Sequence, residues 1–235
     1  QKIRLKEEEL MKYTSLFLDL DNTLLDFNKA EYYAAKKLFE KYGLPSGDQA
    51  IKTYSSINAV FWKRFENGEI KKYEIYENRF KVFCEFYKVQ ADTAKMSTDY
   101  FTNLSEGYYT VDGTFDILDY LKSKNYRLYA TTNGMSLTQF KRIKNSGLEP
   151  YFDNVFVSED AGHQKPEKEY FEYVLKNIPE KDKSKILIVG DSQSSDILGG
   201  INIGIDTCWF NPKKEKPKHL PKYEIEDLLQ LKNIL

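Results

Sequence analysis

Cysteine and histidine are scarce in this sequence, with two of each among 235 residues. Cys84 and Cys208 stand far apart, and no Cys or His pair has the spacing of zinc ligands, so we expect two buried free thiols and no zinc site. With only His163 and His219, neither a His-based metal centre nor a Ser-His-Asp triad is indicated.

An excess of one charge is also absent, as are long hydrophobic runs. The chain has 35 basic and 36 acidic residues and a net charge of −1, which gives no general attraction to nucleic acid or anionic membranes. The basic loop 213–218 is interpreted as solvated surface. No apolar run reaches the length of a membrane span, and no signal peptide is indicated. We expect a cytoplasmic protein without membrane or nucleic-acid partners, while the oligomeric state is left open.

Short apolar, β-prone segments alternate with helical patterns along much of the chain. This alternation predicts a doubly wound parallel α/β sheet, a Rossmann-like core. The expected helices lie at 114–124, 136–145, 166–177 and 194–203. The expected strands lie at 14–20, 126–132, 154–158, 185–191 and 206–210, with a short one at 222–225.

The segment 28–107 has no strand pattern and reads as wholly helical, with helices near 28–42, 49–66, 72–87 and 92–106. We interpret it as an inserted all-helical cap domain, and its many Tyr and Phe residues as the packing core of that domain. The α/β core would comprise 11–27 and 108–235. Residues 1–10, before Met11, are predicted to be an N-terminal extension.

Polar residues suited to phosphate chemistry follow four of the predicted strands. Because ligands of open α/β sheets bind at the carboxyl ends of the strands, we expect these residues to converge on one pocket. Each motif alone has an ordinary reading, such as a capped turn or a surface lysine, but four in order favour a site. The residues are Asp19 and Asp21, then Thr132 and Asn133, then Lys165, then Asp191 and Asp196.

Asp19 and Asp21 stand two positions apart, so on extended backbone their side chains point the same way and repel each other. A hard cation with oxygen ligands would compensate this repulsion, and Asp191 can supply a further ligand. Mg²⁺ suits such a set, because it uses few carboxylates together with water and substrate phosphate. No EF-hand spacing supports Ca²⁺.

These motifs resemble those of the haloacid dehalogenase superfamily of phosphohydrolases. The four stand here as DLDNT (19–23), YATTNG (129–134), HQKPE (163–167) and GDSQSSD (190–196), and the insertion resembles the C1 cap of that family. The stretches 19–27, 57–70, 131–134 and 195–212 further resemble the noncanonical pyrimidine nucleotidases, which are 5′-nucleotidases. One departure is Asp112-Gly113, where relatives usually carry Pro-Gly.

The resemblance implies a mechanism and a set of roles. Asp19 would form an aspartyl phosphate, Asp21 would act as general acid and base, and Lys165 would stabilise charge on the phosphoryl oxygens. Thr132 and Asn133 would bind the same oxygens. The ligands of Mg²⁺ would come from Asp19, Asp21 and Asp191, and Asp196 would orient its neighbours without binding the ion directly.

The expected substrate is a small phosphorylated metabolite, specifically a pyrimidine nucleoside 5′-monophosphate. A sugar-phosphate phosphatase or phosphomutase shares every core motif and stays an alternative. A 2-haloacid dehalogenase is disfavoured because it lacks an acidic residue at the position of Asp21. A phospho-receiver-like signalling module and a catalytically silent scaffold are the non-enzymatic alternatives. The long insertion argues against the receiver, and the intact acidic residues argue against the scaffold.

Overall fold

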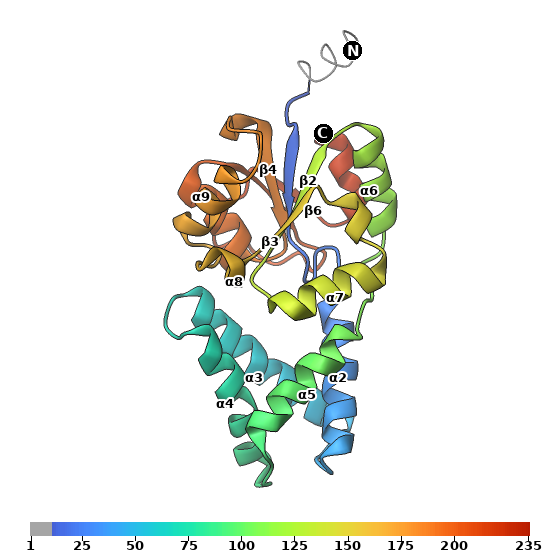
Figure 1. Ribbon diagram of the computed structural model, residues 1–235, viewed down its shortest axis with the longest axis vertical. Coiled ribbons are helices and arrows are strands. Elements are labelled where there is room, and N and C mark those ends of the chain that lie inside the picture. Colours follow the sequence, from blue (N-terminus) through green and yellow to red (C-terminus); the bar gives the residue numbers. More distant parts are fainter. Residues whose placement is uncertain (1–10) are drawn as a thin grey trace. The chain divides into compact units, whose positions relative to one another are not determined.

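A computed structural model describes residues 11–235, so the expectation for residues 1–10 lies outside the described residues. One six-stranded sheet forms the centre of the α/β part, with the strand order β3-β2-β1-β4-β5-β6 and every neighbouring pair parallel (Figure 1). This sheet confirms the predicted fold class. The strands are β1 (Ser15–Leu18), β2 (Arg127–Thr132), β3 (Asn154–Val157), β4 (Ile186–Gly190), β5 (Asp206–Phe210) and β6 (Tyr223–Ile225).

The first strand of the chain occupies the middle of the sheet. β1 pairs with β2 on one side and with β4 on the other, and its residues are buried on both faces. An apolar run without alternation is what a strand covered on both faces requires. The residues that follow β1, β2 and β4 are therefore brought to the same edge of the sheet.

Helices cover both faces of the sheet, with α6 (Thr114–Ser123) on one side and α9 (Lys168–Lys176) on the other (Figure 1). The predicted helix 194–203 is in fact two elements, a π-helical turn η3 (Gln193–Ile197) and α10 (Leu198–Ile203). The widened turn carries Asp196, whose side chain approaches Gly190 at the end of β4, and π turns are frequent at functional sites. Short α8 (Ser158–Ala161) and the 3₁₀ segments η1 (Glu149–Tyr151), η2 (Lys183–Lys185) and η4 (Leu228–Asn233) also belong to this part.

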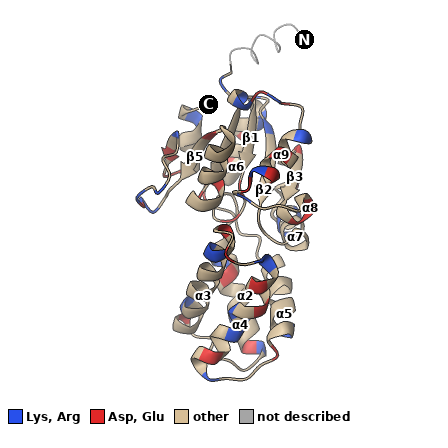
Figure 2. Cartoon of the chain, turned by 90° about the vertical axis from the view of Figure 1, so that its left-hand side faces the viewer, with Lys and Arg blue, Asp and Glu red and all other residues tan. Residues whose placement is uncertain are grey.

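A separate unit contains the predicted helices α2 (Phe27–Lys41), α3 (Asp48–Glu66), α4 (Lys72–Tyr87) and α5 (Thr93–Ser105). Its core is aromatic, as expected: the Phe39 and Phe83 rings stack at 4.2 Å, and those of Tyr54 and Phe80 at 5.1 Å. Basic and acidic residues are interspersed along these helices (Figure 2). Among residues 11–235, no helix combines the length and apolar character needed to cross a bilayer.

The helix α7 (Ser136–Ser146) groups mainly with the helical unit. That unit comprises residues 26–109 and 137–146, whereas residues up to Leu25, 110–136 and 147–235 form the α/β unit. The sequence had placed the helix 136–145 in the α/β core. Its assignment has a physical cause, since Arg142 Nε donates to the Gly107 carbonyl at 2.9 Å and Lys141 pairs with Glu106 at 2.5 Å.

Candidate active site

Asp19 lies directly beyond β1, in the centre of the sheet edge. Its backbone N–H donates to the Val189 carbonyl at 2.9 Å, which continues the pairing of β1 with β4. A tight turn follows, in which Asn22 has a left-handed φ of 61° and the Leu20 carbonyl accepts from Leu24 N at 2.9 Å. Asn tolerates this conformation better than most residues. The turn fixes the backbone on both sides of Asp21.

Lys165 is enclosed in the site and bridges two carboxylates. Its Nζ donates to Asp19 Oδ1 at 2.6 Å, to Asp196 Oδ1 at 2.6 Å and to the Thr131 carbonyl at 2.9 Å. The side chain is only 1% exposed. Because all three ammonium protons have acceptors, the buried charge is fully hydrogen-bonded, and the ammonium group is held in one position.

Asn133 fixes the backbone of Lys165. Its side-chain Nδ2 donates to the Lys165 carbonyl and its Oδ1 accepts from the Lys165 N–H, each at 2.9 Å. The loop after β2 and the loop that carries Lys165 are thus joined by a two-point contact. Within the first loop, Thr132 Oγ1 accepts from Gly134 N at 3.0 Å.

Thr23 connects the first motif to the fourth. Its hydroxyl donates to Asp19 Oδ2 at 3.1 Å and accepts from Asp191 N at 3.1 Å. Trp209 Nε1 donates to the Asp191 carbonyl at 2.8 Å from the neighbouring strand β5. The bonds from Asp191 N to Thr23 and from Trp209 to the Asp191 carbonyl anchor the backbone of Asp191. Neither Thr23 nor Trp209 was among the predicted site residues.

Asp196 is fully buried behind Lys165. Its second oxygen, Oδ2, accepts from Ser192 N at 3.1 Å, so both oxygens are engaged within the protein. Gly190 allows this close approach, because a Cβ at that position would lie 2.2 Å from Asp196 Oδ2. The glycine of the G-D motif is therefore required by packing against Asp196.

Three carboxylates lie close together, and two of them, Asp19 and Asp196, accept hydrogen bonds from the Lys165 ammonium group. Asp19, Asp191 and Asp196 each offer an oxygen within 4.8 Å of the others. Burial raises the pKa of Asp19 to about 7, against the attraction of Lys165, and the charges of Asp196 and Asp21 raise it further. If all three carboxylates ionise, two negative charges remain in excess. A hard divalent cation would balance them, and the all-oxygen donor set fits Mg²⁺.

The structure brings the predicted residues of the site together at one sheet edge. Asp21 lies in the turn beyond Asp19 and is partly exposed, as Asp191 and Asn133 are. The Asn133 side chain makes a contact that the sequence did not indicate, since its amide is committed to the Lys165 backbone. The one available signal in the sequence was that Asn133 of the second motif and Lys165 of the third were expected at the same sheet edge.

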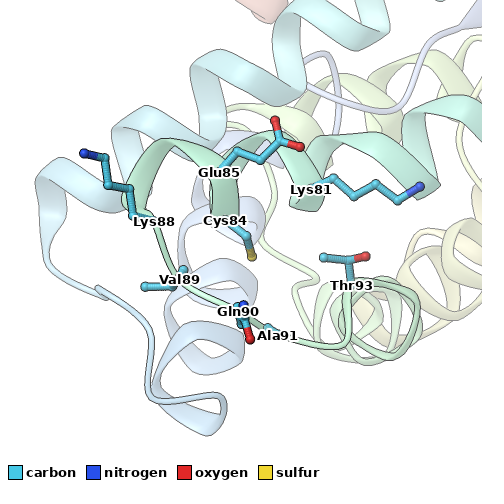
Figure 3. Close-up of a pocket in the computed structure, with 8 residues that line it drawn as sticks. All are labelled: Lys81, Cys84, Glu85, Lys88, Val89, Gln90, Ala91 and Thr93. Carbon is cyan, nitrogen blue, oxygen red and sulfur yellow. The ribbon is translucent and has the colours of Figure 1, made fainter.

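A hollow of about 640 Å³ lies in the helical unit beside α4 and the start of α5, lined by Lys81, Cys84 and Glu85 among others (Figure 3). Cys84 is a buried free thiol, as is Cys208, which confirms the expected state of both cysteines. Burial raises the pKa of the Cys84 thiol, which disfavours the reactive thiolate. The hollow thus offers no activated nucleophile.

A parallel sheet of this strand order, with a buried lysine–carboxylate cluster at its carboxyl edge, defines an α/β enzyme with a Rossmann-like fold. Residues 16–210 match the haloacid dehalogenase-like hydrolase family. The chain belongs to this family and is a hydrolase, which confirms the resemblance found in its motifs.

Similar proteins cover the whole fold. YfnB of Bacillus subtilis, named as a hydrolase of the same family, is 42% identical over 96% of this chain and 97% of its own length. Its crystal structure, described as bound to magnesium, has a TM-score of 0.90 and covers 96% of this chain and 99% of that one.

Two further relatives are named pyrimidine 5′-nucleotidases. PynA of Streptococcus pneumoniae is 38% identical over 96% of this chain and 98% of its own. YjjG of Escherichia coli is 30% identical over 96% of this chain and 99% of its own. The narrower resemblance noted in the sequence thus extends over nearly the full chain.

Proposed function

We propose that this protein is a Mg²⁺-dependent phosphomonoesterase that works through an aspartyl phosphate on Asp19 and hydrolyses pyrimidine nucleoside 5′-monophosphates. One observation carries the chemical part of the proposal: Lys165 holds Asp19 and Asp196 together at 2.6 Å each, beside Asp191, at the carboxyl edge of the sheet. A carboxylate, an ammonium group and a cation-binding acid at one point are what phosphoryl transfer to an enzyme residue requires.

Asp19 is fixed for attack on phosphorus. Lys165 binds its Oδ1 and Thr23 its Oδ2, so the carboxylate has one orientation. In the first step a bond forms between an Asp19 oxygen and phosphorus while the bond to the leaving oxygen breaks, and Asp21 gives that oxygen a proton. In the second step Asp21 takes a proton from a water molecule, which attacks phosphorus and frees Asp19.

The remaining residues position the transferred group. The ammonium group of Lys165 faces charge that builds on the phosphoryl oxygens, and Thr132 with the backbone of Asn133 supplies hydrogen-bond donors. Asp19, Asp191 and the Asp21 carbonyl would hold Mg²⁺. When bound, the ion supplies neutralisation of charge between an anionic nucleophile and an anionic substrate.

The substrate class rests on the relatives named pyrimidine 5′-nucleotidases, which match nearly the whole chain, including the helical unit. The core motifs do not discriminate nucleotides from sugar phosphates, so the latter are the alternative substrates.

A phosphate-release screen with Mg²⁺ tests the proposal. The panel contains dUMP, dTMP, purine nucleotides, ribose 5-phosphate and hexose phosphates. We expect the highest kcat/KM for pyrimidine nucleotides and no turnover by Asp19→Asn, with an unchanged circular dichroism spectrum as the control for folding. A higher kcat/KM for a sugar phosphate would contradict the proposed nucleotide substrate. Near-normal turnover by Asp19→Asn would contradict the proposed role of Asp19 as the nucleophile.

A further inference from the structure

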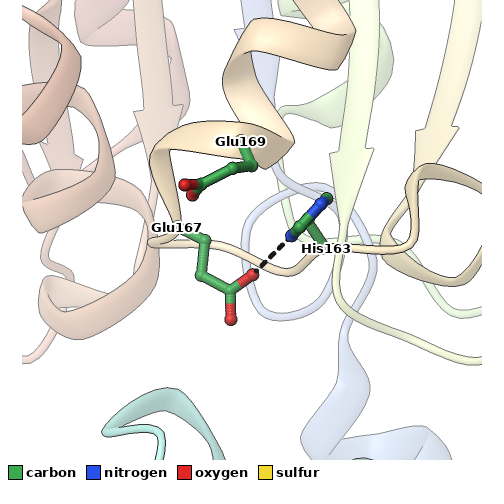
Figure 4. Close-up of side chains that lie close together, drawn as sticks. All are labelled: His163, Glu167 and Glu169. Atoms are coloured by element: carbon green, nitrogen blue, oxygen red, sulfur yellow. Dashed lines mark hydrogen bonds and ion pairs between the residues drawn. The ribbon is translucent and has the colours of Figure 1, made fainter.

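We propose that His163, Glu167 and Glu169 form a second metal site in the α/β unit, one that takes a transition-metal ion such as Zn²⁺. The three side chains lie close together where the Lys165 loop enters α9 (Figure 4). Each offers a ligand atom within 4.8 Å of the other two. The site is separate from the Asp19–Asp191–Asp196 cluster and differs from it in chemistry, because one ligand is an imidazole.

The contact between two of the side chains has the geometry of a chelating pair. His163 Nδ1 lies 3.1 Å from Glu167 Oε2. Ligand atoms about 2.0–2.1 Å from one Zn²⁺ at tetrahedral angles stand about 3.3 Å apart, so the pair needs little movement to share an ion. A mixed set of one imidazole and two carboxylates suits Zn²⁺ or Co²⁺ better than Mg²⁺, which prefers oxygen.

Helix electrostatics explain the two acids but not the imidazole. Glu167 and Glu169 stand at the start of α9, where negative charge is favoured by the helix dipole. His163 precedes the helix, and its ring is placed against the acids by its contact with Glu167. Lys168 does not balance the two acids, since it pairs with Glu172 at 3.2 Å.

The site is accessible, and its backbone is held in place. The His163 side chain is 47% exposed and that of Glu167 38%, so an ion can enter from solvent. Between these two residues, the backbone of Lys165 is fixed by Asn133, which limits the entropy lost on binding. Less conformational entropy is therefore lost when the ion binds than at a site on a mobile loop.

Histidine NMR provides the test, because the chain has two histidines. The full chain, labelled with ¹⁵N in histidine, is titrated with Zn²⁺ in the presence of excess Mg²⁺, which competes at the aspartate cluster. We expect the ring nitrogens of His163 to shift in a saturable way while those of His219 do not. His163→Gln assigns the signals and should abolish the shift.

A charge-removing variant separates a chelate from a lone imidazole. Glu167→Gln with Glu169→Gln should weaken Zn²⁺ binding at His163 by about tenfold or more, since losing two direct ligands costs at least as much as losing groups that only orient ligands, about 10–100-fold. Glu149→Gln, at an exposed glutamate outside the cluster, is the matched control and should bind normally. Unchanged affinity in the double variant, or no His163 shift at millimolar Zn²⁺, would overturn the proposal.

Discussion

At the residue scale, the site depends on how one buried ammonium group is shared. Lys165 contacts a carboxylate that we assign to chemistry, Asp19, and one that we assign to support, Asp196, at the same 2.6 Å. The supporting carboxylate has no exposure to solvent. An isolated buried charge is far more destabilising than an exposed one. Lys165, Asp19 and Asp196 can therefore stay charged in the interior only because each is paired with an opposite charge.

Asp196→Asn should therefore reduce both stability and activity. The variant removes the charge that faces Lys165 but keeps the shape of the side chain. Breaking a buried ion pair costs about 3–5 kcal/mol when one partner is removed. Because Lys165 keeps its bond to Asp19, we expect a loss at the lower end of this range, about 3 kcal/mol. Urea denaturation measures the loss. A stability equal to that of the wild type would mean that Asp196 does not balance Lys165.

Asp21 is tested by the leaving group. If Asp21 protonates the leaving oxygen, Asp21→Asn should lower kcat by about 10²–10⁴-fold for an alkyl phosphate and much less for p-nitrophenyl phosphate, whose leaving group needs no proton. The ratio of the two rates is the quantity to compare, since it cancels any common loss of active protein. Equal losses for both substrates would assign the acid elsewhere.

At the element scale, much of the fold follows from the sequence. The apolar runs predict all six strands to within one or two residues at each end. Parallel strands buried on both faces are continuous apolar segments, which are easily recognised in a sequence. The four cap helices are similarly well placed, between clear separators such as Gly43 and Gly68. Adjacent motifs at strand ends also predict which residues meet at the sheet edge.

Contacts that depend on side-chain direction could not be predicted. The π turn η3 arises from where Asp196 must point, and α7 groups with the helical unit through Arg142 and Gly107, which are far apart in sequence. The hydrogen bonds of Thr23 and Asn133 likewise depend on the distance between loops. Periodicity and turn chemistry carry no information about such distances.

The junction of β4 and η3 provides an element-scale prediction. Gly190→Ala would place a methyl group 2.2 Å from Asp196 Oδ2 and displace that side chain. We expect a loss of about 1–3 kcal/mol in unfolding free energy and a clear fall in kcat. Gly47→Ala is the matched control: a Cβ there meets nothing within 4 Å, so kcat should be unchanged and the capping cost below about 1 kcal/mol.

At the scale of the whole molecule, the proposed cation should act as a stabilising ligand. Because Mg²⁺ would bind the folded chain and not the unfolded one, unfolding free energy should rise by about 2.7 kcal/mol at an ion concentration 100 times Kd. Thermal melting with and without Mg²⁺ measures this, and EDTA should stop turnover reversibly. Asp191→Asn should lose most of the shift in Tm, and a full shift in that variant would place the ion elsewhere.

The other edge of the sheet makes stability dependent on pH. Asp206, at the start of β5, accepts from Tyr13 Oη at 2.6 Å and from Lys222 Nζ at 2.5 Å. Partial burial opposes its ionisation, but these hydrogen bonds outweigh the burial and hold the pKa of Asp206 below its ordinary value. The contribution to stability is thus present above the unfolded-state pKa of about 4 and is lost as pH falls through the lower folded-state pKa.

Asp206→Asn should reveal this dependence. We expect the variant to be less stable than the wild type at pH 7 by about 1 kcal/mol, and the difference to shrink as the pH is lowered below about 4. Urea denaturation at a series of pH values measures both quantities. A difference that stays constant down to pH 2 would show that the charge of Asp206 is not involved.

The way α7 is shared has a consequence for engineering. Residues 137–146 contribute to the helical unit although they come from a distant part of the chain. A chimera that exchanges 26–109 alone would leave Arg142, which is fully buried, facing a foreign backbone in place of Gly107. Such a chimera would fold poorly, so a failure to transfer substrate specificity between relatives would reflect misfolding and not a lack of substrate recognition. A graft that includes both segments preserves this contact and is the design to build.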